Sequence, residues 1–166
     1  MLLRREIGLE QARLMFRRDA AAVVLDVDHE RIVVRVGTHL NLPFDEAMRR
    51  TRDALKEQGF GVLTEIDVQA TLKQKINAEF RRYVILGACN PTMAHRALQA
   101  ELDLGLLLPC NVVLYEEDGG TTVRMMDPVA ALSLATNPAI APVAAEVRVL
   151  LEQALHTLQH AETFDR

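Results

Sequence analysis

Cys89 is the residue best placed to do chemistry, because it precedes a stretch typical of a helix start. Asn90 is a favoured N-cap residue, and Pro91 suits the first position of a helix. If a helix begins there, the Cys89 thiol lies near the positive end of the helix dipole, which lowers the pKa of a thiol. Such a cysteine could be a nucleophile, a redox group or a metal ligand. The alternative interpretation is a small buried residue in a tight turn.

Two further residues could assist Cys89, and each also has a structural interpretation. Cys110 lies in a long apolar run, where a core role is the simplest explanation. If its strand neighbours the one before Cys89, the two thiols could form a dithiol switch or a two-sulfur metal site. His95 could activate a thiol or supply a nitrogen ligand, or it could be a partly exposed helix residue. The spacing of Cys89 and His95 matches no standard zinc pattern, and the sequence identifies no metal site or cofactor.

Four polar residues complete the set of candidates. Asn90 and Asn111 could each donate a hydrogen bond to an anion, although a helix cap and a bulge explain them equally well. Glu65 and Asp67 fall on the same face of an expected strand and could act as acid and base. The alternative for this pair is a solvent-exposed strand edge whose carboxylates are paired with nearby basic side chains.

The elements that must position these residues follow from apolar spacing and turn residues. The pattern predicts helices over about 44–58, 68–76, 90–101 and 143–158, and strands over about 31–36, 61–67, 82–88, 104–115 and 121–126. Pro109 interrupts the fourth of these strands and indicates an edge position or a bulge. Residues 116–120 predict a hairpin loop, so the last two strands are antiparallel. We therefore predict an α+β two-layer sandwich, a mostly antiparallel sheet with helices on one face.

The first thirty residues are expected to be an extension of a single domain that spans residues 31–160. Residues 3–18 indicate a weakly amphipathic helix, and apolar runs at 22–27 and 31–36 are consistent with a short hairpin. The extension could cap a sheet edge or mediate association. A basic start is followed by acidic residues and by no small-residue cleavage site, so we expect no signal peptide. We interpret the protein as cytoplasmic, with two reduced thiols.

Length and charge exclude several classes of function. The chain has 166 residues, of which 19 are Lys or Arg and 23 are Asp or Glu, for a formal net charge of -4. Without a basic excess we expect no nucleic-acid partner, and without an apolar run of transmembrane length we expect no membrane partner. The sequence contains no phosphate-binding loop, no nucleophile-elbow serine and no paired CxxC motif.

Four motifs, in this order, resemble one known family. They are GFGVLTEIDV at 59–68, LGACNP at 86–91 followed by Ala94-His95, LLPCNVV at 107–113, and MDP at 126–128. Together they resemble the bacterial and archaeal domain of unknown function 302 family over about residues 32–156. The resemblance implies a small α+β domain, similar to the TATA-binding-protein-like β-α-β arrangement and often dimeric. It implies no reaction, and the likeness of fold gives no reason to expect DNA binding, because fold does not determine function.

Two classes of function therefore remain open. We favour a non-catalytic ligand-binding or interaction module, expected to be a homodimer, whose small-molecule site lies around Cys89, His95 and Cys110. The alternative is a cytoplasmic thiol protein in which Cys89, assisted by Cys110 or His95, binds or carries a sulfur species or a thiophilic metal. An enzyme that uses Glu65 and Asp67 is the weakest hypothesis, and the sequence indicates neither a substrate nor a cofactor.

Overall fold

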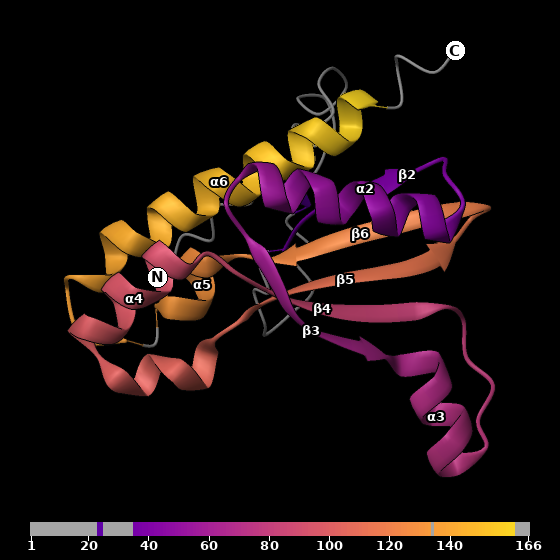
Figure 1. The fold of residues 1–166 in the computed structure, drawn as a ribbon, viewed down its shortest axis with the longest axis horizontal. Helices are drawn as coiled ribbons and strands as arrows, with labels where there is room; N and C mark the ends of the chain where they lie inside the picture. The colour runs from indigo at the N-terminus through magenta and orange to yellow at the C-terminus, as the bar shows by residue number, and fades with distance from the viewer. Residues whose placement is uncertain (1–22, 25–34, 134, 162–166) are drawn as a thin grey trace, which may run out of the picture.

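One antiparallel sheet organises the protein, as Figure 1 shows. The computed structural model describes residues 23–24, 35–133 and 135–161. The strands of the described chain are β1 (Val23–Val24), β2 (Arg35–Leu40), β3 (Gly61–Asp67), β4 (Tyr83–Cys89), β5 (Cys110–Glu117) and β6 (Gly120–Met126). They form a single sheet in the order β1-β2-β6-β5-β4-β3, and each neighbouring pair is antiparallel. The predicted α+β fold with an antiparallel sheet is confirmed.

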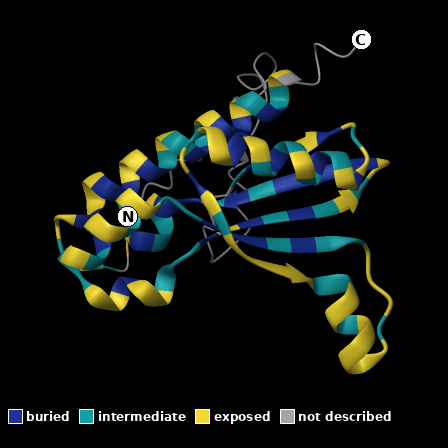
Figure 2. Cartoon of the chain, in the orientation of Figure 1, coloured by how far each residue is buried: buried dark blue, intermediate teal, exposed yellow. Residues whose placement is uncertain are grey.

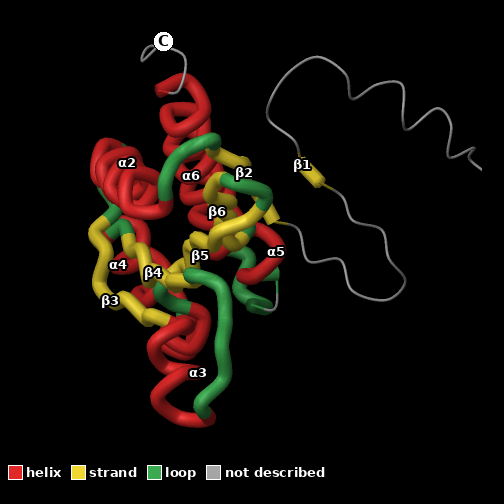
Figure 3. The backbone as a smooth tube through the Cα atoms, turned by 90° about the vertical axis from the view of Figure 1, so that its right-hand side faces the viewer, coloured by secondary structure: helices red, strands yellow, loops and turns green. Residues whose placement is uncertain are grey.

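Most of the helices cover one face of this sheet. They are α2 (Phe44–Glu57), α3 (Val68–Ile76), α4 (Pro91–Ala100), a short 3-10 helix η1 (Leu102–Leu107), α5 (Pro128–Leu132) and α6 (Ile140–Ala161). In Figure 1, α2 and α6 lie across the sheet, and α4 and α5 gather at one end of α6. Figure 3 shows α3 projecting from the rest of the domain, and none of its residues is buried. No helix in the described ranges is long and apolar enough to cross a membrane.

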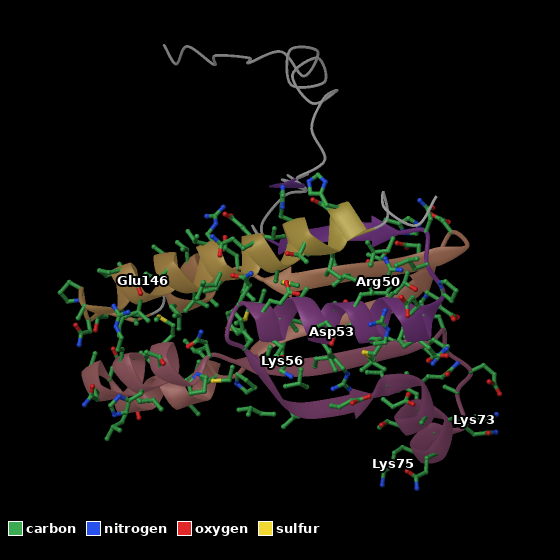
Figure 4. All side chains as sticks on the ribbon, turned by 45° about the horizontal axis from the view of Figure 1, so that its top comes forward. Arg50, Asp53, Lys56, Lys73, Lys75 and Glu146 are labelled. Atoms are coloured by element: carbon green, nitrogen blue, oxygen red, sulfur yellow. The ribbon has the colours of Figure 1, made fainter. Side chains whose placement is uncertain are left out.

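The core lies between the sheet and these helices because side chains alternate along each strand. In β4, Val84, Leu86 and Ala88 are buried, and Leu86 pairs with the buried Val112 of β5. In Figure 2 the buried residues lie along the central strands and on parts of the helices. Each large side chain buried in this core stabilises the fold by about 1.5–3 kcal/mol. The outer face of α2 is charged, and Figure 4 shows Arg50, Asp53 and Lys56 along this helix. Figure 4 also shows Lys73 and Lys75 on α3 and Glu146 on α6.

Short polar side chains set the helix starts. The Oδ1 atom of Asn90 accepts a hydrogen bond from the backbone N–H of Met93 at 3.2 Å, and Pro91 follows at the first helical position, as predicted. Asp127 caps α5 by accepting from the backbone N–H of Val129 at 2.8 Å. These caps satisfy N–H groups that have no partner within the helix. The two starts lie on either side of the end of the sheet that holds the candidate site.

The apolar run at 104–115 is not one strand, which corrects the prediction. Its first part is the 3-10 helix η1, in which Leu106 is 88% exposed, and β5 begins only at Cys110. Pro109 lies directly before the strand, and its bond to Leu108 is cis. The expected edge position is wrong as well, because β5 lies between β4 and β6 in the interior of the sheet. A proline that precedes the first strand residue removes no hydrogen bond from the ladder, so an interior strand can follow it.

The N-terminal and hairpin predictions have different outcomes. Val23 pairs with Val36 in an antiparallel β1–β2 pair, and the turn of the expected hairpin lies outside the described residues. The expected helix over residues 3–18 lies outside the described residues. The predicted hairpin loop between β5 and β6 is present, and Gly119 adopts a φ of 79° there, which favours glycine.

Candidate functional site

A small pocket lies where β4 ends and β5 begins, and both cysteines line it. Its remaining walls come from Phe60, the end of β6, α4, α5, α6 and the end of η1, and most of the lining side chains are apolar. The internal space is about 30 Å³, which is room for one or two water-sized groups. The pocket therefore combines two thiols, an apolar wall and little space.

Cys89 is the last residue of β4 and stands directly before the cap of α4. The helix start predicted there is present, but the expected effect on the thiol is not. Burial raises the pKa of the half-buried Cys89 thiol above its ordinary value. The free-energy cost of removing a thiolate from water exceeds the stabilisation that the positive end of the helix dipole provides. The helix dipole alone predicts a lower pKa for this thiol, and burial reverses the direction.

Cys110 is the first residue of β5 and lies opposite Ala88, the residue before Cys89. Its side chain is 7% exposed. Burial, and to a smaller extent the charge of a thiolate on Cys89, raise the pKa of Cys110 to about 11. Both cysteines are free. The strand register thus brings the two thiols close enough for a charge on one to affect the pKa of the other. Both thiols carry their protons at neutral pH.

The other sequence candidates lie elsewhere. His95 is an exposed residue of α4 and is not part of the pocket wall, so the structure does not bring its ring to Cys89. Asn111 is exposed and follows Cys110 on a strand, so it points to the opposite face of the sheet. Asn90 does line the pocket, while its side chain caps α4.

Glu65 and Asp67 are both engaged in structural interactions. Glu65 of β3 forms an ion pair with Arg52 of α2. Asp67 caps α3 by accepting a hydrogen bond from the backbone N–H of Ala70 at 2.8 Å. The two carboxylates therefore have structural partners, and neither lines the pocket.

Sequence reasoning missed two methionines that line the pocket, Met93 in the first turn of α4 and Met126 at the end of β6. The Sδ atom of Met93 accepts a hydrogen bond from Arg96 at 3.5 Å. Met93 lies three residues after the Asn90 cap, and Met126 lies directly before the Asp127 cap. Their positions next to predicted helix starts were the available signal in the sequence. With the cysteines, four sulfur-containing side chains from three strands and a helix surround one cavity.

The pocket contains no strong acid or base. Among its lining residues none is His, Asp or Glu. In the parts of the chain that the structure describes, no group of three or more His, Cys, Asp or Glu residues is arranged to hold a metal ion. The arrangement can therefore bind a small or soft group, but it offers no general base for turnover.

Comparison with known proteins agrees with the fold. A family model described as "Domain of unknown function DUF302" matches residues 36–158. A solved structure described as "Crystal structure of uncharacterized conserved protein DUF302 from Bacillus stearothermophilus" is 32% identical in sequence, with a TM-score of 0.70. The similarity covers 75% of this chain and 97% of that one. No curated protein matches the chain.

Proposed function

The chain belongs to the DUF302 family, and from that premise we propose that it is a non-catalytic binding module whose ligand occupies the pocket at Cys89 and Cys110. The family description and the solved relative name no reaction, so the support comes from the geometry of this chain. One observation carries the proposal: two free thiols share a small, apolar pocket that has no ionisable residue of any other kind in its wall.

The protonation of the thiols favours binding over catalysis. A cysteine nucleophile acts as the thiolate, and enzymes lower its pKa or place a base beside it. Here burial raises the pKa of both thiols, and no histidine or carboxylate lines the pocket. The acid–base hypothesis has less support still, because Glu65 pairs with Arg52 and Asp67 caps a helix.

The size of the pocket limits the ligand. Sites for drug-sized molecules enclose about 300–1,000 Å³, an order of magnitude more than the 30 Å³ found here. A larger ligand would require one wall to move, and α4 is a suitable wall because Ala97 is its only buried residue. We therefore propose an occupant of one or a few atoms, or a short group that enters beside α4.

A thiol carrier is the second candidate function, and a specific observation favours it. Cys89 and Cys110 line the same cavity, and a charge on Cys89 raises the pKa of Cys110. The two thiols could together ligate one soft ion, or one of them could accept a sulfane sulfur from a donor persulfide, which is left as its thiol. In either form the protein would hold its cargo at the pocket thiols without altering it.

We also propose that the protein is a homodimer and works in a reducing compartment. The face of the sheet opposite α2 and α6 carries half-buried apolar residues, among them Tyr83 and Tyr115, whose rings stack with centroids 5.4 Å apart. An apolar sheet face is a suitable surface for a second copy. The reducing compartment accords with two cysteines that share a pocket and are free.

Disulfide trapping tests the binding function. A Cys110→Ser variant, in which Cys89 is the remaining cysteine, is equilibrated with a library of small disulfides under partly reducing conditions, and capture is measured by intact mass. We expect Cys89 to retain a subset of fragments at least tenfold more than the average. The matched control carries Thr92→Cys in a Cys89→Ser, Cys110→Ser background, because Thr92 is exposed on the same helix and lies outside the pocket.

Two results decide the outcome of this experiment. Ala97→Leu adds volume inside the pocket, and we expect it to abolish selection at Cys89 while circular dichroism shows an intact fold. Equal capture of all fragments at Cys89 and at the Thr92→Cys control would show that the pocket selects no ligand.

A further inference from the structure

We propose that the pocket binds a single soft monovalent metal ion of the Cu(I) type, held by the sulfur atoms of Cys89 and Cys110 with the thioether of Met126 as a third ligand. This inference rests on the binding function proposed for the same pocket and specifies its ligand. It follows from which side chains line the cavity and from how little space they leave.

The sheet brings these three residues to the same end because β5 lies between β4 and β6. Cys89 ends β4, Cys110 begins β5 opposite Ala88, and Met126 ends β6. In an antiparallel sheet the end of one strand lies beside the beginning of its neighbour, so the three residues meet at one end of the sheet. All three line the same cavity. Thiolate and thioether sulfurs are the ligands that Cu(I) prefers.

The two methionines of the wall are not equivalent. The Met93 sulfur already accepts a hydrogen bond from Arg96, which in turn pairs with Glu146 of α6. For Met126 no hydrogen bond to sulfur is present within the described chain, and the residue is half-buried at the wall. We therefore assign the thioether ligand to Met126 and a packing role to Met93.

The same cavity is unsuitable for other occupants. A space of about 30 Å³ admits an ion without its water shell and excludes most organic ligands. Structural zinc sites use four Cys or His ligands, and catalytic ones use three protein ligands. The described residues contain no such group of His, Cys, Asp and Glu. Calcium and magnesium require several oxygen ligands, and no carboxylate lines this pocket.

Binding is an exchange of protons for the ion, without electron transfer. Each thiol loses its proton, one sulfur–metal bond forms at each thiolate, and two protons leave to solvent for every ion bound. The bis-thiolate complex has one net negative charge. It forms next to the N-terminus of α4, a ten-residue helix whose positive dipole end favours negative charge.

An anaerobic competition experiment tests the inference on the full, reduced chain. Cu(I) is supplied as its coloured bicinchoninate complex, and the loss of colour reports transfer to the protein. We expect the wild-type chain to withdraw one Cu(I). Cys89→Ser and Cys110→Ser should each weaken binding at least tenfold, and Met126→Leu about three- to tenfold. His95→Ala is the matched control, because this exposed imidazole lies outside the pocket, and it should leave binding unchanged.

X-ray absorption at the copper edge of the loaded wild-type chain supplies a readout that needs no variant. We expect sulfur as the only type of directly bound atom, whereas nitrogen or oxygen ligands would overturn the assignment. Wild-type binding no tighter than that of the Cys89→Ser, Cys110→Ser double variant would also overturn it. If fragments are still captured at Cys89, that failure removes the metal and leaves the binding module. If capture fails too, both proposals are wrong.

Discussion

Pro109 lies against Gly87 across the β4–β5 pair, where only a glycine leaves room for it. A Cβ atom at Gly87 would lie 2.7 Å from the Cγ atom of Pro109 and would also collide with Thr64 of β3. Gly87 is two residues before Cys89, and Pro109 directly precedes Cys110. This close approach therefore positions the segment that delivers the second thiol to the first.

We expect Gly87→Ala to destabilise the protein and to widen the separation of the two thiols. Overpacking of this kind costs about 1–3 kcal/mol. Urea unfolding measures the loss of stability. Gly105→Ala is the matched control, because a Cβ atom there would have its nearest neighbour at 3.9 Å, and it should change the free energy of unfolding much less. Equal effects of the two substitutions would show that Gly87 does not position the strand.

Alkaline pH should weaken the fold through Cys110. Burial raises the pKa of this thiol from its ordinary 9.0 to about 11, so the folded protein holds the proton more tightly than the unfolded chain. The resulting stabilisation is fully present below pH 9 and is lost as the pH rises toward 11. Two pKa units correspond to about 2–3 kcal/mol.

The measurement for this prediction is urea unfolding of the wild type and of Cys110→Ala between pH 8 and about 11. The stability difference between them should shrink across this range, because alanine does not titrate. Parallel curves would mean that the folded and unfolded states hold the Cys110 proton equally.

Removal of the carboxylate at Asp127 should destabilise the end of the sheet that holds the pocket. Asp127 is 2% exposed, caps α5, and lies 3.5 Å from the Arg148 guanidinium of α6. Asp127→Ala removes the cap and leaves Arg148 without this partner, so we expect a loss of about 1–3 kcal/mol in chemical denaturation. Asp53→Ala breaks an exposed pair with Arg49 and should cost less than about 1 kcal/mol. A smaller effect at Asp127 than at Asp53 would contradict the account.

The proposed dimer predicts a change in mass in solution. Ile85 lies on the sheet face opposite α2 and α6, and Ile85→Glu would bury a charge if a second copy covered this face. We expect sedimentation velocity to show a dimer for the wild type and a monomer for the variant. Val149→Glu, at a 51% exposed position of α6, should remain dimeric. A monomeric wild type would remove the dimer proposal.

Local signals in the sequence predicted the helix starts well. Asn90 and Asp127 cap helices because their short side chains reach backbone N–H groups a few residues ahead, which needs no knowledge of the remaining chain. The secondary structure of the apolar run that contains Pro109 was harder to predict, because leucine occurs in strands and in 3-10 turns alike. The close approach of Pro109 to Gly87 on another strand, directly before β5 begins, is not visible in the sequence.

The candidate site could be predicted only in part, because it depends on strand register and on helix phase. The sequence leaves open whether Cys89 and Cys110 are neighbours. The pairing of β4 with β5 decides this question. His95 was expected to be able to reach Cys89, but α4 turns Met93 and Ala97 toward the pocket instead. The predicted direction of the Cys89 pKa shift was wrong. Burial is a property of the folded chain, and its effect on this pKa outweighs that of the helix dipole.

The rate of alkylation of Cys89 in the native protein tests most directly whether the pocket is a binding site. The experiment uses Cys110→Ser, iodoacetamide and a series of urea concentrations below the unfolding transition. Because Cys89 is half-buried at the wall of the pocket, we predict labelling by local opening, at a rate that rises with pH and is nearly independent of urea. A rate that follows the global unfolding equilibrium would show that no ligand reaches this thiol in the folded state, and it would contradict the proposed function.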